Sequence, residues 1–321
     1  MFKKGETASC GIEKSFWISK RNVSFVAIFY TFLWGSAFPL VKICMENFSV
    51  SENDNMSKCL IAGIRFFFSG CLTLAIFRLL QKGQKRVTLG RRHRIMVCAY
   101  GIMGTAFQYA FTYIGLTYVA GSKGAVLDQM SVFLVVLASG LFFKNDRLNV
   151  FKVLGCIFGF TGIMVSNLSG FDLNFTLQGE GVMILAAIFN AIAYFLAKKT
   201  SEDIPAMLLV GYGQLIGGIL LCAFGFFFGG RVTSVTSGAI ASLIMLIFIS
   251  SVAYVLSLMP LQYHPASEIS SFQLLITVFG AIMSAALLRE NILKWNYILA
   301  FALVASGIYM VNYTKRTKCI I

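Results

Sequence analysis

Residues 23–44 read VSFVAIFYTFLWGSAFPLVKIC, an apolar run whose one charged residue is Lys42. A helix needs about 20 apolar residues to cross roughly 30 Å of hydrocarbon at 1.5 Å per residue, so this run predicts a transmembrane helix. Comparable runs predict nine further spans, at 57–80, 95–117, 120–143, 149–168, 177–197, 206–228, 236–258, 266–288 and 295–314. The sequence therefore predicts an all-α integral membrane protein with ten transmembrane helices.

The overall composition agrees with this class. The chain has 321 residues, of which 58% are hydrophobic and 12% charged, whereas soluble domains carry about 25% charged residues. Its net charge of +14 lies mainly in loops and tails, as orientation signals do, so we expect no nucleic acid. The expected partners are a small-molecule substrate and membrane lipid, and a homodimer stays open. We expect no cofactor and no metal.

The distribution of Lys and Arg predicts the orientation. If the N-terminus is cytoplasmic, the inside segments carry 20 basic residues and the outside loops carry five. Cytoplasmic loops are enriched in Lys and Arg. We therefore expect cytoplasmic tails at 1–22 and 315–321, in a plasma (inner) membrane.

A weak internal repeat divides the chain into halves at 23–168 and 177–314. Leu148–Asn167 aligns with Leu293–Asn312, and Trp34–Lys42 aligns with Asn190–Lys198. The first helix then corresponds to the sixth and the fifth to the tenth. Because each half has five helices, the second half must enter the membrane upside down. Inverted repeats are a transporter architecture, with the substrate site near the midplane between the repeats.

Several motifs resemble the drug/metabolite transporter superfamily, in particular its EamA-type ten-helix members. They are FLWGSAFPLVK at 32–42, IRFFFSG at 64–70, GTAFQYAFTYIGLTYVAGSKGAVL at 104–127 and ASEISSFQLLITVFGAIMSAALLRE at 266–290, and Asp146 resembles an acidic residue of the first half. Ser131 and Thr277 stand where many members have proline. The resemblance implies alternating access, often with export of amino acids or other metabolites.

Asp128 is the most informative candidate residue, because it lies deep in the fourth predicted span. A charge at mid-membrane costs about 2.5–3.5 kcal/mol on insertion scales and usually faces the bundle interior or a wet cavity. One interpretation is a carboxylate that binds a cationic group or exchanges a proton. The other is a structural ion pair with Arg65, which lies at a similar depth. The two interpretations stay open, and both roles can coincide.

Further candidates are polar and aromatic residues of the spans. The predicted substrate-binding residues are Trp34, Gln108, Tyr113, Asp128, Tyr194, Tyr254 and Gln273. The predicted coupling or ion-pair residues are Arg65, Asp128 and Glu268. For Glu268, the helix dipole at the start of the ninth span is the simpler interpretation. The aromatic residues and amides also suit lipid contact or helix packing.

The leading function is a secondary active transporter that exports a small amino acid-like or drug-like metabolite. A nucleotide-sugar carrier is the first alternative, although few basic residues are available for its phosphates. A membrane-embedded transferase is the second, although no convergent His, Asp or Glu set accompanies Asp128, so we expect no enzyme. Nucleotide-driven pumping is disfavoured because the chain has no phosphate-binding loop motif. Cys44 and Cys59 flank the first loop, where an oxidising side would allow a disulfide.

Overall fold

The computed structural model describes residues 15–51, 53–81, 88–115, 118–119, 127–144, 146–166, 175–288 and 295–313. The terminal tails are thus mostly outside the described residues. The described α-helices are α2 (Lys20–Asn47), α3 (Asn55–Leu80), α4 (Arg91–Gly101), α5 (Gln108–Gly115), α7 (Met130–Phe142), α8 (Val150–Ser166), α9 (Val182–Thr200), α10 (Ala206–Phe227), α11 (Ser237–Leu258), α12 (Ala266–Ser271), α13 (Leu275–Leu288) and α14 (Trp295–Asn312). Short π or 3-10 segments are η1 (Ile102–Phe107), η3 (Leu177–Gly181), η4 (Met259–Gln262) and η5 (Phe272–Leu274).

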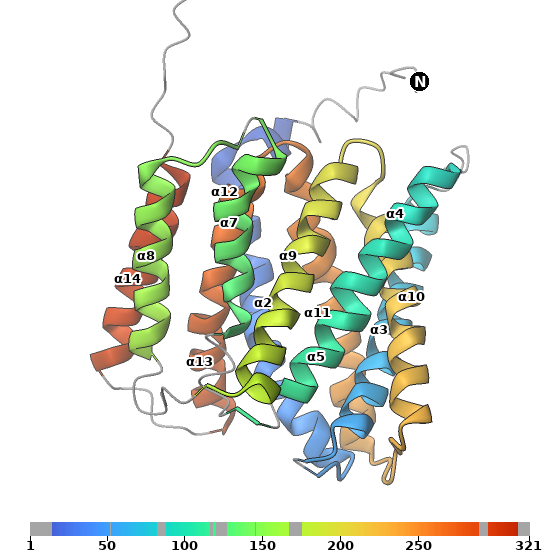
Figure 1. Cartoon of the computed structure of the whole chain (residues 1–321). Coiled ribbons are helices and arrows are strands. Elements are labelled where there is room, and N and C mark those ends of the chain that lie inside the picture. The colour runs from blue at the N-terminus through green and yellow to red at the C-terminus, as the bar shows by residue number, and fades with distance from the viewer. Residues whose placement is uncertain are drawn as a thin grey trace, which may run out of the picture.

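These helices form ten passages along the predicted spans (Figure 1). The third passage joins α4, η1 and α5, and the ninth joins α12, η5 and α13. Within the described residues, six helices are long and apolar enough to cross a membrane individually. Shorter apolar helices, Met130–Phe142, Val150–Val165 and Ile298–Asn312, accompany them. The prediction of an all-α membrane protein of about ten helices is confirmed.

The helix contacts are symmetric under exchange of the two halves. The first passage, α2, packs on α13 and α11, and its counterpart α9 packs on the corresponding helices α7 and α5. Two helices pack on their own counterparts, α3 on α10 and α8 on α14. The pair α3 and α10 is antiparallel, since Gly63 lies against Cys222 while Gly70 lies against Gly211. Two equivalent helices that pack antiparallel are related by a two-fold axis perpendicular to them. The second repeat therefore runs in the opposite direction to the first, so the repeats are inverted.

Glycines allow these two central pairs to approach closely. A Cβ at Gly63 would lie 2.5 Å from the Cys222 backbone nitrogen, and one at Gly155 would lie 2.7 Å from the Gly307 carbonyl oxygen. Both distances are below any real Cβ contact. Small residues at helix interfaces bring backbones together, which is how helices associate in lipid without a hydrophobic driving force.

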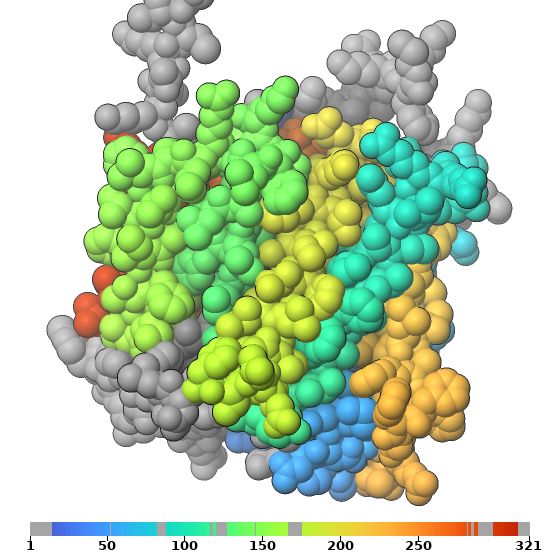
Figure 2. Space-filling model, viewed as in Figure 1, coloured from blue at the N-terminus to red at the C-terminus, as the bar shows by residue number. Residues whose placement is uncertain are grey.

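The outer surface of the bundle is apolar. Figure 2 shows α8, α7, α9 and α4 side by side across one face. Large apolar side chains stay exposed on these helices, for example Leu141 at 86%, Phe142 at 66% and Ile157 at 54%. Exposed apolar area on this scale marks a membrane or partner contact, and on helices of membrane-spanning composition it suits contact with lipid. Cys44 and Cys59 are buried free thiols, so the disulfide does not form in this structure.

The first and last helices meet at one end of the bundle. Lys20 of α2 and Asn312 of α14 line the same surface pocket, and Figure 1 shows α14 ending at the end where α2 begins. This end also carries Arg78, Arg91, Arg92, Lys144 and Lys152 at helix ends. We call it the basic end.

Candidate functional site: a central cavity between the two halves

A cavity of about 220 Å³ lies between the two halves. It is lined by α2, α3 and α5, by residues at and just before α7, and by α9, α11, η5 and α13. The lining residues are Trp34, Ala37, Phe38, Val41, Arg65, Gln108, Tyr109, Thr112, Tyr113, Asp128, Gln129, Ser131, Asn190, Tyr254, Gln273 and Ile276. Both repeats therefore supply its walls, and it contains charged, amide and aromatic groups together.

Two helix irregularities lie at the cavity. The π-helical segment η1 ends directly before Gln108, and the 3-10 segment η5 contains Gln273. Each interrupts an otherwise α-helical passage. Local departures of this kind often occur at functional sites, because they rotate the following side chains relative to a regular helix. Here they accompany one lining amide from each half.

Aromatic residues form one wall of the cavity. The Tyr109 and Tyr254 hydroxyl groups share a hydrogen bond at 2.7 Å. The Trp34 and Tyr254 rings meet edge to face with centroids 5.0 Å apart, and the Phe66 and Tyr109 centroids are 4.5 Å apart. Such ring pairs contribute about 0.5–1.5 kcal/mol beyond area burial. These contacts join α2, α3, α5 and α11.

Arg65 brings a positive charge to the cavity. Its side chain leaves α3 and its Nε donates a hydrogen bond to the Ser250 Oγ of α11 at 2.7 Å. Its guanidinium carbon lies 5.1 Å from the centre of the Phe66 ring. The residue is only 6% exposed. A buried charge at this depth is costly unless it is paired or faces a wet cavity.

Asp128 brings a negative charge to the same cavity. It lies just before α7, where its backbone carbonyl accepts a hydrogen bond from Ser131 Oγ at 2.9 Å. Among the described residues, no Lys, Arg or His lies within 4.0 Å of its carboxylate, so the ion pair with Arg65 is not formed here. The two opposite charges therefore line one cavity without neutralising each other directly.

Amide side chains complete the polar lining. Asn190 Nδ2 donates to Ser131 Oγ at 3.2 Å and so joins α9 to α7. The buried Gln129 Oε1 has no hydrogen-bond partner among the described residues. A buried polar atom left unpaired costs about 1–3 kcal/mol. Gln129 therefore offers a polar group that a ligand or water in the cavity can satisfy.

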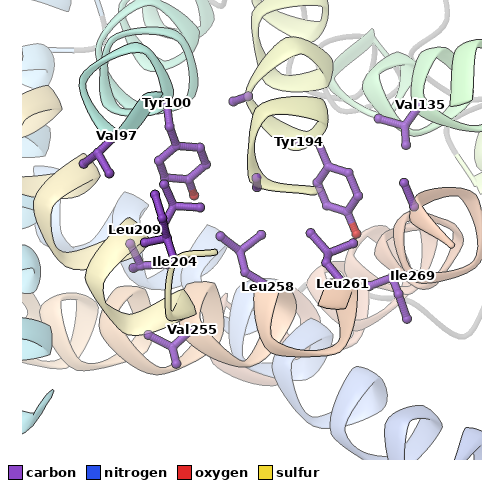
Figure 3. Packing of buried hydrophobic residues seen from close by; sticks show 14 of the residues in the cluster. Val97, Tyr100, Val135, Tyr194, Ile204, Leu209, Val255, Leu258, Leu261 and Ile269 are labelled. Atoms are coloured by element: carbon purple, nitrogen blue, oxygen red, sulfur yellow. The ribbon is translucent and has the colours of Figure 1, made fainter. Parts of the chain in front are cut away.

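A hydrophobic cluster lies between the cavity and the basic end. A smaller space of about 30 Å³ continues from it, sharing Trp34, Gln108 and Tyr254 and adding Tyr100 and Tyr194. Beyond lies the hydrophobic cluster shown in Figure 3, whose buried members include Tyr100, Tyr194, Leu258, Leu261 and Ile269. The Tyr194 hydroxyl has no hydrogen-bond partner among the described residues. We call this cluster the inner plug.

Polar contacts within and between the halves reinforce the basic end. Asp146, which precedes α8, accepts hydrogen bonds from the Ser267 nitrogen of α12 at 2.9 Å and from Ser267 Oγ, and it pairs with Lys152. Lys198, at the end of α9, donates to the Leu261 carbonyl and to the His264 carbonyl. These contacts hold the loops beside the inner plug together.

The structure places most predicted site residues together. Trp34, Arg65, Gln108, Tyr113, Asp128, Tyr254 and Gln273 line the central cavity, and Tyr194 lines the smaller space next to it. Glu268 does not lie in the cavity: it starts α12 at the basic end, with an oxygen 3.4 Å from Lys20 Nζ. Tyr109 and Asn190 line the cavity although the sequence did not single them out. The repeat alignment pairs Asn190 with Trp34, so Asn190 could have been predicted as the equivalent residue in the second half.

These features define a membrane transporter built from two inverted five-helix repeats. The sequence matches the model of the EamA-like transporter family over residues 22–168 and 177–313, and the chain belongs to that family. The family belongs to the drug/metabolite transporter superfamily, as its motifs indicated, and is not a family of enzymes.

Individual relatives cover nearly the whole chain. It is 23% identical to the uncharacterized transporter YvbV of Bacillus subtilis, over 94% of this chain and 95% of that protein. It is 26% identical to an uncharacterized transporter of Archaeoglobus fulgidus, over 89% of this chain and 96% of that one. A solved crystal structure matches with a TM-score of 0.72 at 15% identity, covering 90% of this chain and 97% of that chain. The last similarity concerns the fold alone.

Proposed function

We propose that this chain is a secondary active transporter that exports a small metabolite from the cytoplasm by alternating access. Residues 23–168 and 177–314 are the two halves that move against each other around the central cavity. The basic end faces the cytoplasm, with both termini, in a plasma or inner membrane. This orientation follows the preference of Lys and Arg for cytoplasmic loops.

The observation that carries the proposal is a polar cavity walled by both halves, with the inner plug between it and the basic end. Tyr100, Tyr194 and Leu258 of this cluster line the smaller space beside the cavity, and Leu258 also lines a separate pocket that opens among residues of the basic end. A channel needs a continuous path, whereas a carrier needs a site that is closed on at least one side at a time. Substrate sites at the interface of inverted repeats have this geometry.

The cavity favours an amino acid-like metabolite over a larger drug-like one. Its volume of about 220 Å³ is below the range of about 300–1,000 Å³ typical of drug-sized ligands. Asp128 suits an ammonium group, and the aromatic wall suits an apolar body. A nucleotide-sugar carrier needs several cations for the phosphates, but among the described lining residues Arg65 is the one Lys or Arg.

A growth screen followed by flux measurement tests the proposal. A sensitive host overexpressing the chain is grown on toxic amino acids and analogues, purines and drugs. The matched control is Asp128→Asn at equal membrane abundance. We expect resistance to one compound class with the native chain, and uptake of that class by inside-out vesicles, which should both be lost in the control. Equal growth and equal vesicle uptake with and without the chain over the whole panel would refute the proposal.

A further inference from the structure

A buried polar network holds Arg65 in one orientation. Ser250 accepts from Arg65 Nε at 2.7 Å, and its own carbonyl accepts from Gln214 Nε2 at 3.3 Å. The Gln214 Oε1 accepts from Ser69 Oγ at 2.7 Å, and Ser69 Oγ lies 2.9 Å from Ser251 Oγ. These four supporting residues are at most 3% exposed. They join α3, α10 and α11 behind the guanidinium.

The network satisfies the Nε donor of a guanidinium that belongs to a cavity-lining residue. A guanidinium has five N–H donors, and the Nε donor is the one with an acceptor among the described residues. No described Asp or Glu lies within 4.0 Å of Arg65. The two Nη groups are therefore available at a residue that lines the cavity.

A fixed Arg with free Nη groups has a specific chemical preference. Its planar fork matches the two oxygens of a carboxylate, with two parallel hydrogen bonds, and it is pre-organised for this contact. Leaving these buried donors without an acceptor costs free energy. A small anionic group in the cavity would satisfy these donors and the charge together.

We propose that Arg65 is a carboxylate-binding subsite of the central cavity and that Ser250 is the residue that positions it. This inference rests on the proposed transport function and adds a substrate group to it. Ser250 lies behind Arg65 and does not line the cavity. It acts by fixing the direction in which the guanidinium fork points.

The probes are the twenty L-amino acids and their C-terminal amides, each measured by thermal stabilisation of the purified chain in detergent. An amide keeps the side chain and ammonium group but lacks the carboxylate. We expect at least one acid to stabilise the native chain with an apparent affinity at least tenfold above that of its amide. A charge-assisted hydrogen bond of about 1.5–3 kcal/mol gives a factor of this size.

Four variants and one control separate positioning from folding. Arg65→Gln should abolish the preference for acid over amide. Arg65→Lys keeps a charge but loses the fork, so it should fold and lose most of that preference. Ser250→Ala should reduce it about tenfold, and Ser250→Thr, which retains a hydroxyl, should restore it. Ser242→Ala is the matched control, because Ser242 is a buried serine of the same helix whose side chain contacts the Ala239 carbonyl and Cys44 rather than Arg65.

In reconstituted vesicles, Ser250→Ala should raise KM for the acid about tenfold with Vmax unchanged, while Ser242→Ala changes neither. A purely structural role would lower the active amount, and hence Vmax, without changing KM. Equal binding of every acid and its amide, or no binding of any acid, overturns the carboxylate subsite. An unchanged preference in Ser250→Ala overturns the positioning role. Transport that persists in either case leaves the proposed function standing, whereas failure of the growth screen and vesicle uptake refutes that function separately.

Discussion

Asp146→Asn is expected to destabilise the protein by about 3–5 kcal/mol. Asp146 is 2% exposed and accepts from the Ser267 nitrogen, from Ser267 Oγ and from Lys152 Nζ. Hydrogen bonds to charged groups contribute about 1.5–3 kcal/mol each. An asparagine whose oxygen takes the Oδ1 position keeps the contacts from Ser267 Oγ and Lys152, but its NH₂ group then faces the Ser267 nitrogen, so one bond is lost and the charge that strengthens the other two is removed. Breaking a buried pair by removing one partner has a similar cost.

The assay is thermal unfolding of the purified chain in detergent, with Asp203→Asn as the control. Asp203 is also at the basic end, but its side chain is 65% exposed and lies 3.7 Å from His93. Exposed ion pairs contribute only about 0–1 kcal/mol, so this control should melt within a degree or two of the native chain. Replacing Lys152 by Met together with Asp146→Asn should recover part of the loss, because no buried charge is then left unpaired. Equal melting temperatures of Asp146→Asn and Asp203→Asn would refute this reasoning.

Three other expectations concern transport, packing and orientation. Asp128→Asn should insert and melt like the native chain, because no described basic group pairs with the carboxylate. It should lose export, because the carboxylate is the proposed binding or proton-exchanging group. Normal flux at every pH would contradict this. Gly63→Ala should lower the melting temperature by several degrees, because its Cβ would lie 2.5 Å from the Cys222 nitrogen, whereas Gly90→Ala, with only His93 at 4.0 Å, should not. Reporter fusions at position 172 and at the C-terminus should report opposite sides of the membrane, and the same side for both would exclude the proposed topology.

The sequence predicts the helices well because length and hydropathy determine them. Nearly every predicted span begins and ends within a few residues of an observed passage. The main exception is the fourth, predicted at 120–143, whose first residues lie largely outside the described ones; the described α7 begins at Met130. The positions of apolar runs and loops can be read directly from the sequence. In lipid, backbone N–H and C=O groups must hydrogen-bond within the protein, so a long apolar run forms a helix.

The sequence predicts the cavity less completely, because depth along a helix can be counted but rotation about its axis cannot. Arg65 and Asp128 were expected at similar depth, and both line the cavity. Whether they pair depends on the direction of each side chain, and Ser250, 185 residues further along the chain, accepts a hydrogen bond from Arg65 and so directs its side chain toward α11. The π-helical turn before Gln108 adds a local rotation that no hydrophobic period reveals.

Two helix pairs, α3 with α10 and α8 with α14, are each made of counterparts from the two repeats. If the two halves exchange conformations during the cycle, the contacts of these two pairs stay the same. A contact such as α2 with α13 instead takes the geometry that α9 with α7 had before. The glycine-lined pairs then keep their packing throughout the cycle, and the remaining helices move relative to them. A substitution in one of these pairs should reduce the amount of folded, active protein without favouring the inward-open or the outward-open state. Mutations that bias the cycle are therefore to be sought among α2, α5, α7, α9, α11 and α13.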